Sequence, residues 1–348
     1  MKRLCFLLAL TLLTGGTHAQ DSVRGAGKAK PVRFAVLAHR FDENDEAALQ
    51  EIVARVARRD NAFIVATGIK ADREDCSDKL FQQRKAMLDA ARDPVLVTLT
   101  ADDWVACKNS KGKPAQIERL NRLRELLFPD SRSLGRQKIE VSRQAESAQF
   151  RDYAENAHWI VGDVLFATVN VPWPNNNYRP DAGRNSEYED RHVANREWLQ
   201  RVFRLARSKK LAGVVLFSDA DLYTAPTKRR LRDVFTGGGL RDGLQDLRRY
   251  LDKGVQQFGG RVLLIDRRTA PDPYAVGPQQ NLAGDRAAVK RGIEWRGKLG
   301  HVSLAAQPSD TAWIALRADS TLPALFLLEE GGKVETEKKA DESEAGAR

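Results

Sequence analysis

The sequence predicts an α/β protein, and three observations support this. Short apolar, β-branched runs alternate with segments of helical period in the first third of the chain. A strand–helix–strand–helix–strand order is typical of parallel βαβ units with right-handed crossovers. The chain has 348 residues, 42% of them hydrophobic, which is enough to bury one large core or two smaller ones.

The first half of the chain supplies the alternating pattern. Buried strands are predicted over residues 32–38, 62–66 and 95–99, and amphipathic helices over residues 46–58, 79–92 and 117–128. Asp102 and Asp103 follow the third strand. Because functional groups gather beyond the carboxyl ends of strands in open α/β sheets, these two carboxylates are candidate site residues.

The second half continues with more strands than helices. The pattern predicts a hairpin of residues 160–161 and 164–171, helices over residues 186–206 and 227–253, and strands over residues 211–217, 261–265, 301–305 and 312–317. The strand 211–217 ends in Ser218-Asp219-Ala220-Asp221, and the strand 261–265 ends at Asp266. Both ends therefore carry carboxylates on predicted loops.

The two ends of the chain differ from the middle. Residues 1–19 have a basic start, a short apolar run and a small-residue cleavage site after Ala19, which is the pattern of a secretory signal peptide. No segment approaches the roughly 20 apolar residues of a membrane span. We therefore expect an exported protein, periplasmic or secreted, without a transmembrane segment. Residues 20–31 are predicted to be a linker, 32–329 one domain, and 330–348 a disordered charged tail.

Two cysteines, Cys76 and Cys107, remain after removal of the signal peptide. In an exported chain, two cysteines most simply form one disulfide. A Zn site is the alternative, but the sequence has neither a CxxC motif nor a pair of histidines beside these residues. We therefore predict a Cys76–Cys107 disulfide.

The formal net charge of +10 is spread along the chain in short basic clusters. Such a distribution favours a solvated basic surface over a dedicated polyanion site. Aromatic residues do not interleave with the basic clusters, so there is no nucleic-acid-binding signature. There is also no GxSxG motif and no phosphate loop placed after a strand.

The segment that follows the third strand resembles a known family. Its residues are Thr100, Ala101, Asp102, Asp103, Trp104 and Cys107. They are similar to the third metal motif of the calcineurin-like metallophosphoesterases, in an exported bacterial branch where the loop reads Gly-Asp-Asn-Glu-Trp before a Cys. Other landmarks in the same order are Cys76-Ser77-Asp78, Asn156 with Trp159, Val169-Asn170-Val171, Asn175-Asn176-Asn177 and Trp198-Leu199. The resemblance extends from about Val32 to Phe326 and implies an α/β sandwich of mixed β-sheets flanked by helices.

The residues that bind metal in the family are mostly replaced in this chain. The resemblance aligns His39 with the first Asp ligand, Gly68 with the bridging carboxylate and Asp102 with the Asn ligand. Asp219 aligns with a Gln or His ligand. The terminal His-rich turn falls on residues 266–270, where both histidines are absent and Arg267 and Arg268 have entered.

Two interpretations of the remaining polar residues are open. His39, Asp102, Asp219 and Asp266 are candidate ligands for one cation, since His and carboxylates suit Zn, Mn or Fe. The favoured alternative treats them as hydrogen-bonded loop residues without a metal or other cofactor. His39, Asp102 and Asp103 are the candidate catalytic residues, although Asp103 is better placed to cap a turn than to act as a base.

Three functions are compatible with these residues. The favoured one is a catalytically degenerate pseudoenzyme, a binding or accessory protein whose anionic small-molecule or polymer partner is attracted to Arg267, Arg268 and His39. The alternative is an active metal-dependent phosphoric ester hydrolase with a reduced metal site. The third is a cell-envelope protein that binds anionic polymers through its basic surface. Enzymatic activity is therefore open at the level of sequence.

Overall fold

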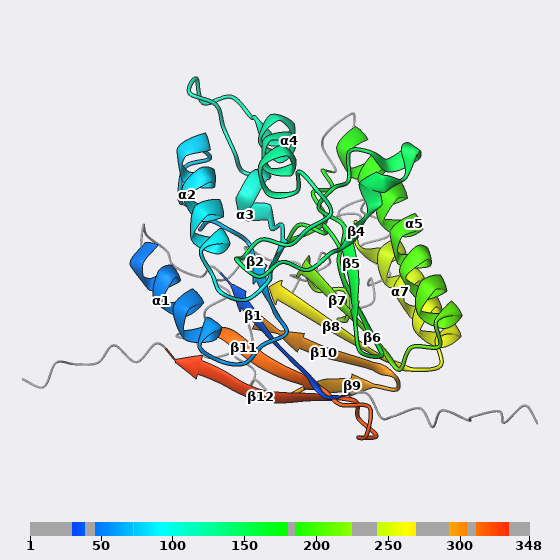
Figure 1. Cartoon of the computed structure of the whole chain (residues 1–348). Coiled ribbons are helices and arrows are strands. Elements are labelled where there is room, and N and C mark those ends of the chain that lie inside the picture. Colours follow the sequence, from blue (N-terminus) through cyan, green and yellow to red (C-terminus); the bar gives the residue numbers. More distant parts are fainter. Residues whose placement is uncertain are drawn as a thin grey trace, which may run out of the picture.

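A computed structural model describes residues 30–38, 46–71, 73–179, 185–224, 242–268, 292–304 and 311–333. The predicted signal peptide, His39 and residues 334–348 lie outside these ranges, as does most of the predicted linker. The described residues form two mixed β-sheets of five and seven strands, which pack face to face with helices on their outer faces (Figure 1). This confirms the predicted α/β sandwich.

The five-stranded sheet contains the βαβαβ unit. Its strands lie in the order β12 (Phe326–Lys333), β11 (Thr311–Ala318), β1 (Val32–Ala38), β2 (Phe63–Thr67) and β3 (Val95–Thr98). The strands β1, β2 and β3 are parallel, and β11 and β12 are antiparallel additions. Apolar side chains of α1 (Glu46–Ala57), α2 (Asp78–Asp89) and α4 (Gln116–Leu127) pack on its outer face.

The seven-stranded sheet supplies the other layer. Its strands lie in the order β4 (Ser142–Arg143), β5 (Ala157–Val161), β6 (Val164–Thr168), β7 (Gly213–Ala220), β8 (Arg261–Arg268), β10 (Leu299–Ser303) and β9 (Glu294–Arg296). The four strands β6, β7, β8 and β10 are mutually parallel. The helices α5 (Ser186–Ser208) and α7 (Gln245–Gln257) cover its outer face.

Aromatic side chains fill the space between the two sheets. The Phe63 ring lies 5.3 Å from the Phe34 ring, 5.2 Å from the Trp159 ring and 4.7 Å from the Phe166 ring, measured between centroids. Aromatic pairs of this kind add about 0.5–1.5 kcal/mol each beyond the burial of their area. This dry core fixes the two sheets against each other and so fixes which strand ends meet.

Several predicted boundaries need correction. Strand β7 runs to Ala220 and β8 to Arg268, because the ladder between them continues through the pair Ser218–Asp266. Asp219 and Asp266 therefore lie within strands and not on loops. Strand β12 runs to Lys333, beyond the predicted domain end at residue 329, because Gly331 and Gly332 still pair with β11. Among the described helices, none is long and apolar enough to cross a membrane.

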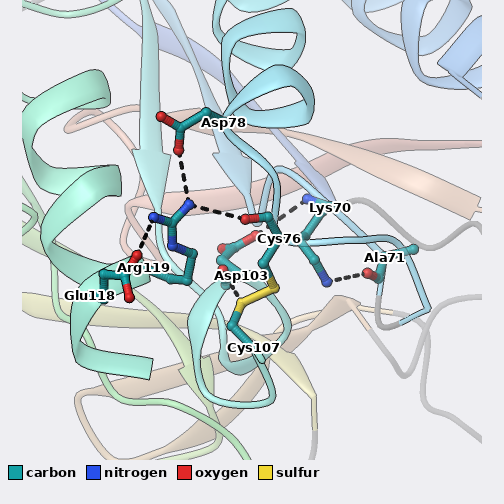
Figure 2. Close-up of a disulfide and its surroundings, with 8 residues drawn as sticks. All are labelled: Lys70, Ala71, Cys76, Asp78, Asp103, Cys107, Glu118 and Arg119. Atoms are coloured by element: carbon teal, nitrogen blue, oxygen red, sulfur yellow. Dashed lines mark hydrogen bonds and ion pairs between the residues drawn. A yellow bond between two sulfur atoms is a disulfide. The ribbon is translucent and has the colours of Figure 1, made fainter. Parts of the chain in front are cut away.

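The predicted disulfide is confirmed. Cys76 and Cys107 are bonded, with their Cα atoms 5.8 Å apart, and they join the loop before α2 to the segment after β3 (Figure 2). Arg119 on α4 reinforces this junction, since its guanidinium donates to the Cys76 carbonyl at 3.3 Å and to Asp78 at 2.9 Å. The disulfide thus holds the start of α2 beside the segment that follows α3 (Ala101–Trp104), and Arg119 attaches α4 to the same place.

Loss of this disulfide should lower the stability of the fold. The bond closes a loop with a sequence separation of 31 residues. On the loop-entropy model, we expect the Cys76→Ser/Cys107→Ser double variant to lose about 3–4 kcal/mol in its free energy of unfolding. Urea denaturation of both proteins, each with and without reductant, measures this. Reductant should lower the midpoint of the wild type and leave that of the double variant unchanged. Equal midpoints for the oxidised wild type and the double variant would contradict the prediction.

Candidate functional site

Polar residues from both sheets meet where the carboxyl ends of β3, β7 and β8 converge. The carboxylate of Asp219, on β7, accepts hydrogen bonds from the Ala101 amide at 2.7 Å and the Trp173 amide at 2.9 Å. Ala101 begins the short helix α3 (Ala101–Trp104) directly beyond β3. Asp219 therefore joins the edge of one sheet to the helix that begins at the edge of the other.

Asp103 holds the α3 helix in place. One oxygen of its carboxylate accepts a hydrogen bond from the Thr100 amide at 2.7 Å, as in a capping box, and another from the Thr100 hydroxyl at 3.0 Å. The other oxygen accepts from the Ile69 amide at 2.9 Å, and from the Lys70 amide at 3.3 Å (Figure 2). Asp103 is fully buried and bonded on both oxygens, which is the geometry of a turn cap.

Arg267 lies between the two other carboxylates of this edge. Its guanidinium forms an ion pair and hydrogen bond with Asp102, and its Nη1 lies 3.8 Å from Asp219 Oδ1. All three side chains are at most 7% exposed. We call Asp102, Asp219 and Arg267 the inter-sheet ion cluster. It brings together two of the predicted metal-ligand candidates, but with a fixed cation between them.

Burial and the neighbouring charges shift the pKa values of the inter-sheet ion cluster and of Asp103 beside it. Burial raises the pKa of Asp219, although the Arg267 charge and the backbone donors oppose that rise. Burial also raises the pKa of Asp103, against the hydrogen bonds from Ile69 and Thr100. For Arg267, burial would lower the pKa, but Asp102 and Asp219 outweigh it and the pKa is raised. Arg267 therefore stays protonated, with its charge neutralised by the carboxylates beside it.

This pairing revises the predicted role of Arg267. An anion-binding arginine needs charge and donors that face a ligand, whereas the Arg267 guanidinium is buried against Asp102. The backbone of Arg268 pairs with Ala220 at the end of β8, and the placement of its side chain is not described. His39 lies outside the described residues. Of the three predicted anion-binding side chains, only that of Arg267 is described, and it faces Asp102 and not a ligand.

Gly68 lies beside Thr100, the residue that precedes α3. It follows β2 with a φ of +79°, and its amide donates to the Thr98 carbonyl at 2.9 Å. A Cβ at this position would lie 3.0 Å from Thr100 Oγ1. The backbone conformation and the close Thr100 side chain both favour glycine here. The local geometry at residue 68 therefore favours glycine over any residue with a side chain.

Asp266, the remaining metal-ligand candidate, does not join this cluster. On β8, Leu264 packs with α5 and α7, and Ile265 packs between the sheets. Successive side chains of a strand alternate between its faces, so Asp266 faces the helices and Arg267 faces the other sheet. The prediction that Asp266 shares a site with Asp102 and Asp219 is therefore wrong.

Asp266 instead forms a second cluster with Asp221 and His301, which we call the outer-face triad. The His301 Nε2 atom lies within hydrogen-bond distance of Asp266 Oδ2 and 3.8 Å from Asp221 Oδ1. Burial raises the pKa of Asp266 to about 6, despite the opposing effect of His301. Burial would lower the pKa of His301, but Asp266 and Asp221 outweigh it and raise the pKa. Because both pKa values are raised, the proton between Asp266 and His301 is held more strongly than it would be on either group in water.

The sequence prediction missed Asp221 and His301 as site residues. Asp221 lies two residues after Asp219, at the end of the same strand, and this spacing was the sequence signal that could have identified it as a site residue. His301 interrupts the apolar strand β10, and its register with Leu264 in the ladder could not be read from the sequence. Only the pairing of β10 with β8 shows that His301 lies beside Asp266.

Comparisons with known proteins leave the family open. No family model and no curated protein matches the chain. Among solved structures, it is similar to "GAP50 the anchor in the inner membrane complex of Plasmodium", with 12% sequence identity and a TM-score of 0.44. That match covers 83% of this chain and 81% of the other. A similarity this low carries no information about the function of this chain.

Removal of the Arg267 charge should destabilise the protein. An Arg267→Gln variant leaves Asp102 and Asp219 buried without a cation, so we expect its free energy of unfolding to fall by about 3–5 kcal/mol. The control is Arg249→Gln, which removes an ion pair to Asp246 whose arginine is 71% exposed. That control should cost at most about 1 kcal/mol. Urea denaturation measures both, and equal losses would contradict the buried pairing.

Proposed function

We propose that the protein is an exported, calcineurin-like metallophosphoesterase-type chain that has lost its dimetal centre and acts as a binding or accessory protein. The observation that carries the proposal is the buried guanidinium of Arg267 between Asp102 and Asp219. The resemblance aligns those two positions with metal ligands of the family. An internal cation here takes the place that bound metal would hold.

The chemistry of a guanidinium supports loss of catalysis. Two-metal phosphoester hydrolysis uses cations roughly 3.5–4 Å apart to polarise the ester and to generate hydroxide from bound water. Arg267 has no open coordination position and does not bind water as a Lewis acid. Its pKa is raised, so it does not act as a base either. What remains at this edge is a structural contact between two sheets.

A metal ion would also have to displace Arg267 from its partners. The guanidinium is 4% exposed, and it is compensated by Asp102 at hydrogen-bond distance and Asp219 at 3.8 Å. Bringing dications into the same place would add like charge at short range. Gly68 contributes no carboxylate to offset that repulsion. The active-hydrolase alternative is therefore less well supported than the non-catalytic one.

The export part of the proposal rests on two features. The sequence carries a signal-peptide pattern in residues 1–19, and the structure contains the Cys76–Cys107 disulfide. Disulfides form and persist in oxidising compartments such as the periplasm or the extracellular space. The chemical class of the binding partner stays a sequence-level hypothesis, an anionic small molecule or polymer.

The test is phosphoesterase activity of the purified protein with added Mn²⁺ or Zn²⁺. We expect no turnover of an aryl phosphate or a bis-aryl diester above the level of an Asp102→Ala variant, because no metal pair forms at the inter-sheet ion cluster. Two equivalents of bound metal, with turnover that is lost in Asp102→Ala, would establish the hydrolase instead. The Asp102→Ala variant should first be checked for folding by circular dichroism.

Restoring the bridging carboxylate should fail for structural reasons. Gly68→Asp places a side chain at φ +79° and against Thr100, so we expect no gain of activity and a loss of stability. The control is Gly112→Asp, where φ is +72° and nothing lies within 4 Å of an added Cβ. Both variants share a left-handed backbone cost of about 1–2 kcal/mol. Thermal unfolding should show the larger loss at Gly68; equal losses would contradict the close contact with Thr100.

A further inference from the structure

The outer-face triad offers a ligand set that the inter-sheet ion cluster lacks. We propose that Asp221, Asp266 and His301 form a binding site for a single divalent cation, Zn²⁺ or Mn²⁺. The site lies on the face of β8 that is turned toward α5 and α7. Of the positions that the family resemblance assigns to metal, the site includes only Asp266, and it does not depend on the proposed function.

The three side chains converge. Each offers one ligand atom, and these atoms all lie within 4.8 Å of one another. Asp221 Oδ1 is 3.8 Å from His301 Nε2. Ligand atoms about 2.0–2.2 Å from a tetrahedral Zn²⁺ lie roughly 3.4 Å apart. The triad therefore reaches this geometry if the Asp266–His301 contact opens by about 1 Å, a distance that side-chain rotation supplies.

A buried carboxylate oxygen without a partner points to a missing ligand. Asp221 Oδ2 is buried and has no hydrogen-bond partner among the residues that the structure describes, whereas Asp266 interacts with the Ser303 hydroxyl as well as with His301. Asp221 and Asp266 are both 0% exposed. A buried carboxylate oxygen without a partner is costly, because it has lost its contact with water. A cation beside Asp221 would satisfy this oxygen.

The ligands are held in position by their neighbours. Asp221 Oδ1 accepts hydrogen bonds from the amides of Tyr223 at 2.6 Å and Thr224 at 3.0 Å, which fix the carboxylate and leave Oδ2 available. The Tyr223 ring stacks on the His301 imidazole with centroids 4.6 Å apart. Arg296 in turn lies over the Tyr223 ring at 4.7 Å. Supporting contacts of this kind orient metal ligands and raise affinity.

The donor set selects the class of cation. One imidazole nitrogen and two carboxylates suit borderline divalent ions such as Zn²⁺ and Mn²⁺, whereas Ca²⁺ takes six to eight oxygens. Cation binding releases the proton held between Asp266 and His301. The two carboxylates and the neutral imidazole then carry two negative charges, which one dication neutralises. His301 is the only one of the three with measurable exposure, 9% of its side chain, and it marks the side from which an ion enters.

Calorimetric titration of the untagged full-length exported protein tests the site. The protein is treated with EDTA, dialysed, and titrated with ZnCl₂ and with MnCl₂. We expect one equivalent to bind and the melting temperature to rise. The variants Asp266→Asn and His301→Gln should each weaken binding by more than about 10-fold. Circular dichroism confirms that each variant folds, and either one that folds is sufficient for the comparison.

The matched control is His192→Gln on α5. His192 is also a partly buried histidine beside a carboxylate, 3.6 Å from Asp246, and it lies on the same side of the sheet. This control should bind Zn²⁺ like the wild type. Failure of the wild type to bind one equivalent saturably, or equal affinity in wild type and His301→Gln, would overturn the proposal and leave Asp266–His301 as an ion pair only. An equal loss in His192→Gln would also overturn it.

Discussion

The arrangement of this protein depends on the charge of Arg267, a cation buried where two sheets meet. Asp102 stands on the five-stranded side, Asp219 on the seven-stranded side, and the guanidinium lies between them. Removing water from these groups is costly, so each persists only because the others are present. The same contacts set the start of α3, since Asp219 binds the Ala101 amide.

Strand alternation explains why the molecule has two polar clusters and not one. Asp266 and Arg267 are adjacent in sequence, yet β8 sends them to opposite faces of the sheet. Arg267 meets carboxylates in the gap between the sheets and forms a buried ion pair there. Asp266 meets His301 and Asp221 under the outer helices, where Asp221 Oδ2 has no partner among the described residues. Arg267 therefore does not occupy the space between the ligands of the outer-face triad.

Much of the fold could be predicted from the sequence, because apolar runs such as that of β1 and helical periodicity such as that of α1 are local signals. The Cys76–Cys107 pair was predictable, since only two cysteines lie outside the predicted signal peptide. The site was less accessible. The extension of β7 through Asp219 depends on its ladder with β8, and the meeting of His301 with Asp266 depends on the register of β10. Both are pairings of residues distant in sequence, which no local pattern encodes.

The most direct measurement is an anomalous-difference map from crystals grown with MnCl₂, collected to locate every bound metal. We predict clear density for the Arg267 guanidinium between Asp102 and Asp219, without an anomalous peak at that position. A single peak is expected among Asp221, Asp266 and His301. One or two anomalous peaks between Asp102 and Asp219, with the Arg267 side chain turned away, would contradict the assignment of Arg267 as the cation of the inter-sheet ion cluster.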